Sequence, residues 1–177
     1  MIARGRWCGA DGCAAARTRA TLRRIGVCRR RGERCGSSCV IGVLGAEEIE
    51  AVLRRNRIGR LGVSANDRPY VVPINYGYDG CYLYGFSGPG RKLDIMREQP
   101  LVSFLVDEID GPSSWRCVVV EAVFEELTGE ADRRAAAQAI TRNGPELVAR
   151  GLDASSPLTF FRLRPIEKSG RFERSDA

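Results

Sequence analysis

Histidine is absent from the 177 residues of this sequence. Catalytic systems that pair a histidine with a serine or cysteine nucleophile are therefore excluded, as are histidine-ligated zinc and haem. An enzyme built on this chain would take its reactivity from a bound cofactor. No strong general acid or base replaces the imidazole, and the remaining candidates, each of which fits a structural role better, are Tyr76, Tyr84 and Asp107.

Long apolar runs are also absent, because no stretch approaches the roughly 20 residues that cross a bilayer. A secretory signal needs a continuous apolar segment after its positive start, and arginines interrupt every candidate. The hydrophobic fraction of 44% and the charged fraction of 28% are typical of globular proteins, and the length suits one domain with its own core. We therefore expect a soluble, cytoplasmic protein without a membrane partner.

Acidic residues are scarce only at the start of the chain. The formal net charge is +6, but residues 1–40 carry ten arginines against Asp11 and Glu33, so the rest of the chain is slightly acidic. We interpret residues 1–42 as an Arg/Cys-rich leader, either disordered or lying outside the natural start of translation, and residues 43–177 as one folded domain. Nucleic acid is not the expected partner, although the leader could add affinity for it.

Cysteine pairs with metal-site spacing are missing as well. Five of the seven cysteines lie at irregular intervals near the start of the chain, at Cys8, Cys13, Cys28, Cys35 and Cys39. Without close pairs or histidine partners we expect no metal site. The odd total favours a reducing cytoplasm. Two further cysteines fall within predicted strands and are expected to be small buried hydrophobes, namely Cys81 and Cys117.

Hydrophobic periodicity predicts a mainly β fold. Helices are predicted over residues 45–56, 91–99 and 128–143, the last with Thr128 as N-cap. Three strands joined by short turns indicate an antiparallel meander, over residues 58–65, 70–78 and 81–86. Further strands are predicted over residues 101–108 and 115–127, and a strand with a turn over 159–173. The expected architecture is a small β-barrel with peripheral helices.

One motif, GFSGPGRKLDIM at residues 85–96, places two cations at the start of a predicted helix. Cations there oppose the helix dipole and cost a few tenths to about 1 kcal/mol each. A bound phosphate reverses that sign, because free N–H groups, the Ser87 hydroxyl, Arg91 and Lys92 would converge on it, while Gly88 and Gly90 let the backbone approach. The alternative is a solvated turn whose basic side chains bend away into water.

A series of segments resembles a known family. The segments are RIGRLGVS, RPYVVPINYGYDG, YLYGFSGPGRKLDIMREQPLVSFLVDE, SWRCVVVEAVFEEL and GRFE, in order from residue 57 to 173. Together they are similar to the pyridoxamine 5'-phosphate oxidase-like family of FMN-binding split barrels, in the branch of flavin-nucleotide-binding proteins related to nitroimidazole reductases. The leader lies outside the resemblance.

The resemblance implies a homodimer with two FMN sites at the subunit interface. It places Ser87, Arg91 and Lys92 at the FMN phosphate. It also implies that one segment runs past the isoalloxazine ring, made of Val72, Pro73, Ile74, Asn75 and Tyr76. A proline within a strand independently suggests an edge or a bulge with free backbone groups.

Other positions have weaker assignments. Arg60 is either a second phosphate contact or an exposed strand arginine, and Trp115 either lines the flavin pocket across the dimer interface or is a structural aromatic. Cys117 stands where the family leads us to expect serine, so a hydroxyl contact there is in doubt. Phe86 stands where relatives often carry histidine, which puts histidine-dependent chemistry and haem ligation in doubt. The C-terminal substrate signature of true pyridoxamine phosphate oxidases is absent, so vitamin B6 synthesis is not predicted.

Two functional hypotheses follow. The first is an FMN-dependent oxidoreductase that passes electrons from a small-molecule donor to a small oxidised acceptor such as a nitro compound or quinone. The second is a non-catalytic FMN-binding or flavin-sensing protein. A deazaflavin in place of FMN, or a purely structural barrel, stays open as a third hypothesis.

Overall fold

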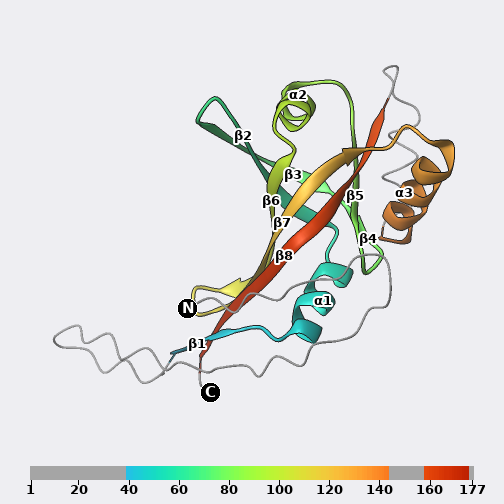
Figure 1. Cartoon of the computed structure of the whole chain (residues 1–177). Helices are drawn as coiled ribbons and strands as arrows, with labels where there is room; N and C mark the ends of the chain where they lie inside the picture. The colour runs from blue at the N-terminus through green and yellow to red at the C-terminus, as the bar shows by residue number, and fades with distance from the viewer. Residues whose placement is uncertain (1–38, 144–157, 176–177) are drawn as a thin grey trace.

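Eight strands and three helices follow one another in the described part of the chain, residues 39–143 and 158–175 of a computed structural model (Figure 1). The strands are β1 Cys39–Val43, β2 Ile58–Ala65, β3 Arg68–Asn75, β4 Gly77–Tyr78, β5 Leu83–Ser87, β6 Leu101–Gly111, β7 Ser114–Glu126 and β8 Thr159–Ser175. The helices are α1 Ala46–Arg55, α2 Arg91–Glu98 and α3 Glu130–Asn143.

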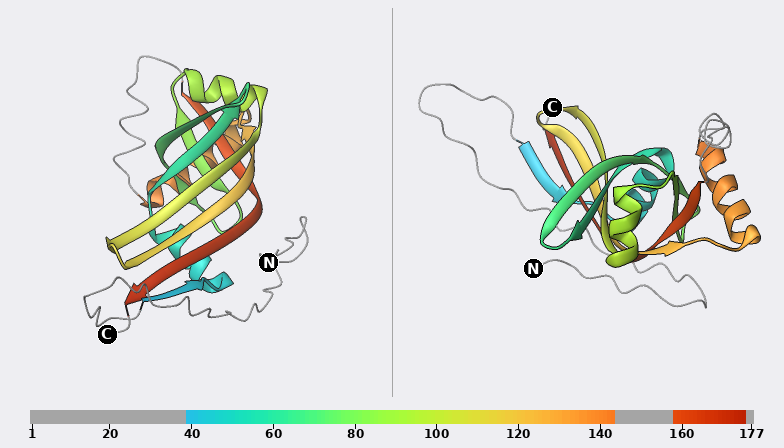
Figure 2. Two further views of the ribbon diagram at one scale, coloured as in Figure 1. Left: turned by 90° about the vertical axis from the view of Figure 1, so that its left-hand side faces the viewer. Right: turned by 90° about the horizontal axis from the view of Figure 1, so that it is seen from above.

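All eight described strands belong to one antiparallel sheet. Its order is β3-β2-β6-β7-β8-β5-β4, and β1 pairs with the far end of β8. Figure 2 shows the sheet curving round on itself, with α2 at one end. The expected fold class, a mainly β barrel with peripheral helices, is confirmed.

The predicted meander is wrong at its third strand. β2 and β3 form a hairpin through Asn66 and Asp67, which have φ of 51° and 58°, but β5 pairs with β8 rather than with β3. Proline explains the unpaired edge, because it has no N–H to give to a ladder. Pro69 and Pro73 are four residues apart, so their backbone groups point the same way, and that way must be away from β2. The outer edge of β3 therefore lacks two donors that another strand would need.

The predicted strand over residues 70–78 is interrupted at Tyr76. Its N–H donates to the carbonyl oxygen of Arg57 at 2.9 Å, and a separate two-residue strand, β4, follows and pairs with β5. The chain thus pairs with β2 as far as Asn75 and with β5 from Gly77 onward. The sheet is left open between β3 on one side and β4 and β5 on the other.

The predicted turn near the end of the chain is also wrong, because β8 is one continuous strand of 17 residues. Its pairing with β7 shifts register where Pro165 faces Ala122 and Glu167 faces Glu121, so that Ile166 is the extra residue of a bulge. The bulge accommodates the proline without ending the strand. Gly170 allows the close approach of α1, since a Cβ there would lie 3.0 Å from Ile49.

The helices close the barrel on three sides. α1 buries Ile49, Val52 and Leu53 against the core, as its spacing predicts, and α2 buries Leu93, Ile95 and Met96. α3 covers a second apolar cluster beside β4 and β5. It begins at Glu130, two residues after the expected cap Thr128, because the carbonyl of Gly129 accepts the first helical hydrogen bond, from Arg133 at 3.0 Å.

The structure agrees only in part with what the sequence predicts for the cysteines and for the leader. Residues 39–42, assigned to the leader, form most of β1 and pair with β8, whereas Cys8, Cys13, Cys28 and Cys35 lie outside the described residues. Cys81 was expected in a strand but lies exposed in the turn before β5, and Cys117 is half-buried in β7. Among the described residues, no acidic or cysteine cluster could hold a metal ion, and no helix is long and apolar enough to cross a membrane.

Candidate functional site

A pocket of about 280 Å³ lies at the opening between β3 and β5, close to the start of α2. Its wall is formed by Ile58 of β2, by Pro73, Ile74 and Asn75 of β3, by Phe86 of β5 and by Lys92 of α2. One wall is thus the edge strand, the opposite wall an aromatic ring, and one end carries a cation. The elements meet at the upper half of the barrel in Figure 1.

The edge strand brings backbone groups to the pocket. β3 ends the sheet, which confirms the expectation that Pro73 marks an edge strand. Because the proline groups point away from β2, the carbonyl of Pro73 and the N–H and carbonyl of Asn75 point the same way, toward the opening. The amide side chain of Asn75 adds a donor and an acceptor. This wall can therefore recognise the polar edge of a flat ligand.

The α2 end of the pocket combines features that suit an anion. Gly90 precedes the helix with φ of 155°, a conformation open to glycine, and its carbonyl accepts from Leu93 at 2.9 Å. The N–H groups of Arg91 and Lys92 have no acceptor within the helix. A Cβ on Gly88 or Gly90 would meet nothing within 4 Å, so there is room beside them. Free donors, space and the positive end of the helix dipole coincide here.

The three residues assigned to a phosphate have different surroundings. Lys92 lines the pocket. Arg91 is exposed, with its guanidinium stacked over the ring of Tyr70, 4.9 Å from the ring centre. Ser87 is 6% exposed, and its hydroxyl donates to the carbonyl of Gly88 at 2.7 Å. The cation in the pocket is thus Lys92, with Arg91 within one residue of it.

Tyr76 and Val72 face the core rather than the pocket. The Tyr76 hydroxyl donates to the carbonyl of Leu53 at 2.9 Å, its ring packs edge-on to Phe104, and burial raises its pKa above the ordinary value. Val72 packs against the same core. Strand alternation places both on the same face of β3 as Ile74, which also belongs to the core but in addition lines the pocket.

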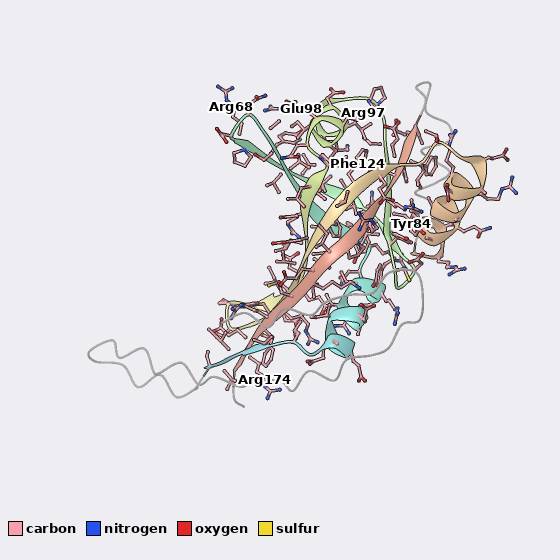
Figure 3. All side chains as sticks on the ribbon, in the orientation of Figure 1. Arg68, Tyr84, Arg97, Glu98, Phe124 and Arg174 are labelled. Carbon is pink, nitrogen blue, oxygen red and sulfur yellow. The ribbon has the colours of Figure 1, made fainter. Side chains whose placement is uncertain are left out.

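The remaining acid–base candidates are engaged in structural contacts. Tyr84 lies beside α3 (Figure 3), where its hydroxyl donates to Asp79 at 2.9 Å, and burial raises its pKa. Asp107 forms an ion pair with Arg60. No acid or base among the predicted candidates is therefore at hand in the pocket.

Arg60, Trp115 and Cys117 lie on the outer face of the sheet and do not line the pocket. The Trp115 indole N–H donates to Glu173 at 2.8 Å. Cys117 stands between Asp107 and Arg171 in the ladder, and burial raises the pKa of its thiol. Arg60 faces Pro73 across the β2–β3 ladder, so the outer face begins next to the pocket.

This outer face carries exposed apolar side chains. Cross-strand partners share a face of a sheet, which places a continuous set of residues there: Ile58, Arg60, Val71, Pro73, Leu105, Asp107, Ile109, Trp115, Cys117 and Val119. Ile58, Val71 and Ile109 are 58%, 64% and 68% exposed. We call this set the outer face below. Ile58 and Pro73 belong to both the outer face and the pocket.

Two pocket residues were not assigned to the site from the sequence. Phe86 packs against Phe160, with ring centres 5.8 Å apart, and joins the pocket to the cluster under α3. It was noticed only as a departure from the family pattern. The sequence does not mark Ile58 as a pocket residue, since an isoleucine at the start of a strand is ordinary. It lines the pocket because it pairs with Asn75.

Comparison with known proteins assigns the chain to a family. The family model described as pyridoxamine 5'-phosphate oxidase matches residues 45–172. An uncharacterized protein of Rhizobium meliloti is 39% identical over 87 residues, which cover 49% of this chain and 58% of that protein. The chain thus matches little more than half the length of this relative.

Solved structures agree in fold. A FAD-binding protein of Mesorhizobium loti is 35% identical with a TM-score of 0.64, covering 76% of this chain and 98% of that chain. A FAD-binding protein of Mycobacterium smegmatis is 22% identical, with a TM-score of 0.58 over 73% of this chain and 97% of that one.

A candidate 5-nitroimidazole antibiotic resistance protein of Bacteroides thetaiotaomicron is 15% identical, with a TM-score of 0.61, covering 94% of this chain and all of that chain. At this identity it supports the fold alone. The family match, the 35% identical structure and the open barrel agree with the resemblance drawn from the motifs. The chain belongs to the pyridoxamine 5'-phosphate oxidase-like family of FMN-binding split barrels.

Proposed function

We propose that this protein binds FMN in the pocket between β3 and β5 and acts as a flavin-dependent oxidoreductase on a small oxidised molecule such as a nitro compound or quinone. One observation carries the proposal: a cation and free helix N–H groups stand at one end of a pocket whose long wall is an unpaired strand edge. That combination suits a phosphate joined to a flat ring with a polar edge.

Each part of the pocket has a role in this proposal. Lys92 and the α2 N–H groups would hold the phosphate, with Arg91 able to join them by leaving Tyr70. The backbone of Pro73 and Asn75 would meet the polar edge of the ring, and Ile58 and Phe86 would exclude water from it. Bound flavin supplies the electron and hydride transfer that the side chains cannot. The protein's part is to bind, orient and shield.

The acceptor class follows from what the pocket lacks. The predicted acids and bases, Tyr76, Tyr84 and Asp107, are bonded elsewhere. The walls contributed by Ile58, Pro73, Ile74 and Phe86 are apolar. Flat molecules that accept electrons without a protein-bound proton donor suit such walls best. This favours nitroaromatic and quinone acceptors over charged substrates.

We also propose that the working unit is a homodimer with a flavin at each interface. The pocket of about 280 Å³ falls just short of the roughly 300–1,000 Å³ typical of ligand pockets. Its rim runs directly into the apolar outer face. A second copy seated there would enlarge and close the site, and it would bring residues such as Trp115 or Cys117 near the flavin.

Two observations favour alternatives. The Mesorhizobium loti relative is a FAD-binding protein, so FAD is the second candidate cofactor. The absence of a free acid or base among the predicted candidates also suits a non-catalytic flavin-binding or flavin-sensing protein.

The first experiment separates these readings. Purified protein is titrated with FMN, FAD, riboflavin and a deazaflavin, with binding followed by flavin absorbance and fluorescence. We expect the tightest binding for FMN and a large loss for riboflavin, which lacks the phosphate. Reduction of the bound flavin by NAD(P)H and reoxidation by a nitro compound or quinone would establish turnover. A protein that binds FMN without being reduced is a sensor or carrier, and one that binds no flavin refutes the proposal.

A paired substitution tests the phosphate assignment. Replacing Arg91 and Lys92 together with alanine should raise the FMN dissociation constant at least about 100-fold, since charge-assisted hydrogen bonds to phosphate contribute about 1.5–3 kcal/mol each. The riboflavin constant should hardly change. The apo protein should stay as stable as the wild type, because the removed charges oppose the helix dipole.

The matched control removes two cations elsewhere. Arg134 and Arg142 are exposed on α3, away from the pocket lining. Their double alanine variant should bind FMN like the wild type. Equal FMN affinity in the Arg91/Lys92 variant and in this control would refute the phosphate site.

A further inference from the structure

A single carboxylate at the end of β6, that of Glu108, gathers groups from two other elements and a loop. Arg55 of α1 donates to it twice, at 2.5 and 2.7 Å. The side-chain amide of Asn56 donates at 2.7 Å, and Arg116 of β7 lies 3.2 Å away. The Glu108 side chain is only 19% exposed. Three partners on one partly buried carboxylate make a fixed junction rather than a surface ion pair.

The junction continues into the pocket through a short chain of hydrogen bonds. The Asn56 amide that reaches Glu108 also donates to the carbonyl of Val52 at 2.9 Å and so ends α1. The next residue, Arg57, accepts the N–H of Tyr76 at 2.9 Å. The residue after that, Ile58, pairs with Asn75, and both line the pocket.

A second hydrogen bond holds the same end of α1. The Tyr76 hydroxyl donates to the carbonyl of Leu53, one turn before Asn56. Burial and, to a smaller extent, the negative charge of Glu108 raise the pKa of Tyr76. The last turn of α1 is therefore held by two contacts, one with Glu108 of β6 and one with Tyr76, the residue after β3.

We propose that Glu108 is a positioning residue for the flavin pocket, setting the places of Ile58 and Asn75 through Asn56 and the end of α1. The inference rests on the proposed function, since it concerns the same pocket. Glu108 itself does not line the pocket. Its effect reaches the site through the backbone of residues 56–58 and their pairing with residues 75–76.

The test compares two isosteric variants. Glu108→Gln keeps the shape but removes the charge that holds Arg55 and Arg116. Glu125→Gln is the matched control, because Glu125 also binds two arginines, Arg162 at 2.6 Å and Arg164 at 2.8 Å, and none of the three lines the pocket. We expect Glu108→Gln to raise the FMN dissociation constant about tenfold, which corresponds to about 1.4 kcal/mol, and Glu125→Gln to leave it unchanged.

A measurement without flavin accompanies the titration. Amide hydrogen exchange at Tyr76, whose N–H donates to the carbonyl of Arg57, should be faster in apo Glu108→Gln than in apo Glu125→Gln, at equal temperature below unfolding. If Glu108→Gln does not fold, Asn56→Ala carries the same test, because it removes the amide that joins Glu108 to the carbonyl of Val52 while both arginines keep their carboxylate.

The outcomes separate this inference from the proposed function. Failure of the wild type to bind FMN refutes the proposed function, and the exchange measurement then decides the positioning role alone. If the wild type binds FMN, equal constants for the wild type and Glu108→Gln refute the positioning role and leave the function standing. Equal weakening by Glu125→Gln would also refute it, since the effect would then be general destabilisation.

Discussion

At the scale of single residues, the least expected group is a buried lysine. Lys168 of β8 has a side chain only 5% exposed, and its ammonium donates to Glu50 of α1 at 2.6 Å and to the Tyr78 hydroxyl. Tyr78 in turn donates to Glu50 at 2.9 Å. The cluster sits where β8 has left β5 and has not yet reached β1. Along this stretch β8 has neither β5 nor β1 beside it, and the side chains of the cluster pack there instead.

Replacing Glu50 with alanine should therefore destabilise the fold strongly. The substitution removes the carboxylate that neutralises a buried ammonium, and breaking such a pair costs about 3–5 kcal/mol. Urea unfolding measures the change. Glu47→Ala on the exposed side of α1 is the control and should change the free energy of unfolding by less than about 0.5 kcal/mol. Equal stability of the two variants would show that the cluster contributes nothing.

At the scale of elements, carboxylates held by arginines join the outer parts of the fold. Glu108 ties α1 to β6, and Glu126 of β7 holds α2 through Arg97 at 2.9 and 3.0 Å. Glu125 ties β7 to β8. The helices that flank the pocket are therefore held by charge as well as by apolar packing.

These links predict acid sensitivity. Hydrogen bonds from Arg55 lower the pKa of Glu108 and those from Arg97 lower that of Glu126. For Glu125, burial opposes the shift, but the hydrogen bonds from two arginines outweigh it. Because the folded pKa values lie below the ordinary value of 4.5, the stabilisation is complete above that pH and is lost as the pH falls through the lowered values.

Urea unfolding between about pH 3 and pH 7 measures this effect. The free energy of unfolding should be flat near neutrality and fall below about pH 4.5. A variant with all three glutamates changed to glutamine should be less stable at neutral pH and have a shallower fall in acid. An unchanged slope in that variant would show that other groups govern the acid transition.

The elements also show how far the sequence alone reaches. The helix predicted over residues 45–56 is present, because a helix is a local structure, and it buries Ile49, Val52 and Leu53. The strand partners were not local, so a meander was expected where β5 pairs with β8, more than 70 residues away. The prolines of β3 held the relevant signal, since they cannot give N–H groups to a neighbour. At the site, Pro73, Ile74, Asn75 and Lys92 were identified, whereas Ile58 depends on that pairing.

At the scale of the whole molecule, we expect the proposed dimer to assemble through the outer face. It combines the exposed side chains of Ile58, Val71 and Ile109 with the ion pair of Arg60 and Asp107. Large exposed apolar surface marks an interface in many proteins, and these three are the most exposed large apolar side chains among the described residues. The pocket opens beside it, so assembly and flavin binding should be linked.

Val71→Glu tests that link. A charge at this 64% exposed position should weaken the proposed dimer, shift sedimentation toward the monomer and lower FMN affinity together. Ala135→Glu on α3 is the control, at an exposed position on a helix rather than on the outer face, and should change neither. Retention of a dimer and full FMN affinity in Val71→Glu would place the interface elsewhere.

The long strand β8 has a consequence for how the chain acquires its structure. It pairs with β1, β5 and β7, and it follows all of them in the chain. Until it is in place, β5 has no neighbour except the two-residue β4, and the core of β6 and β7 has an open edge. During synthesis the earlier strands therefore expose their apolar faces until β8 has been made. Because its partners are so distant in the chain, β8 closes the barrel slowly and late. Until then the chain needs protection against aggregation.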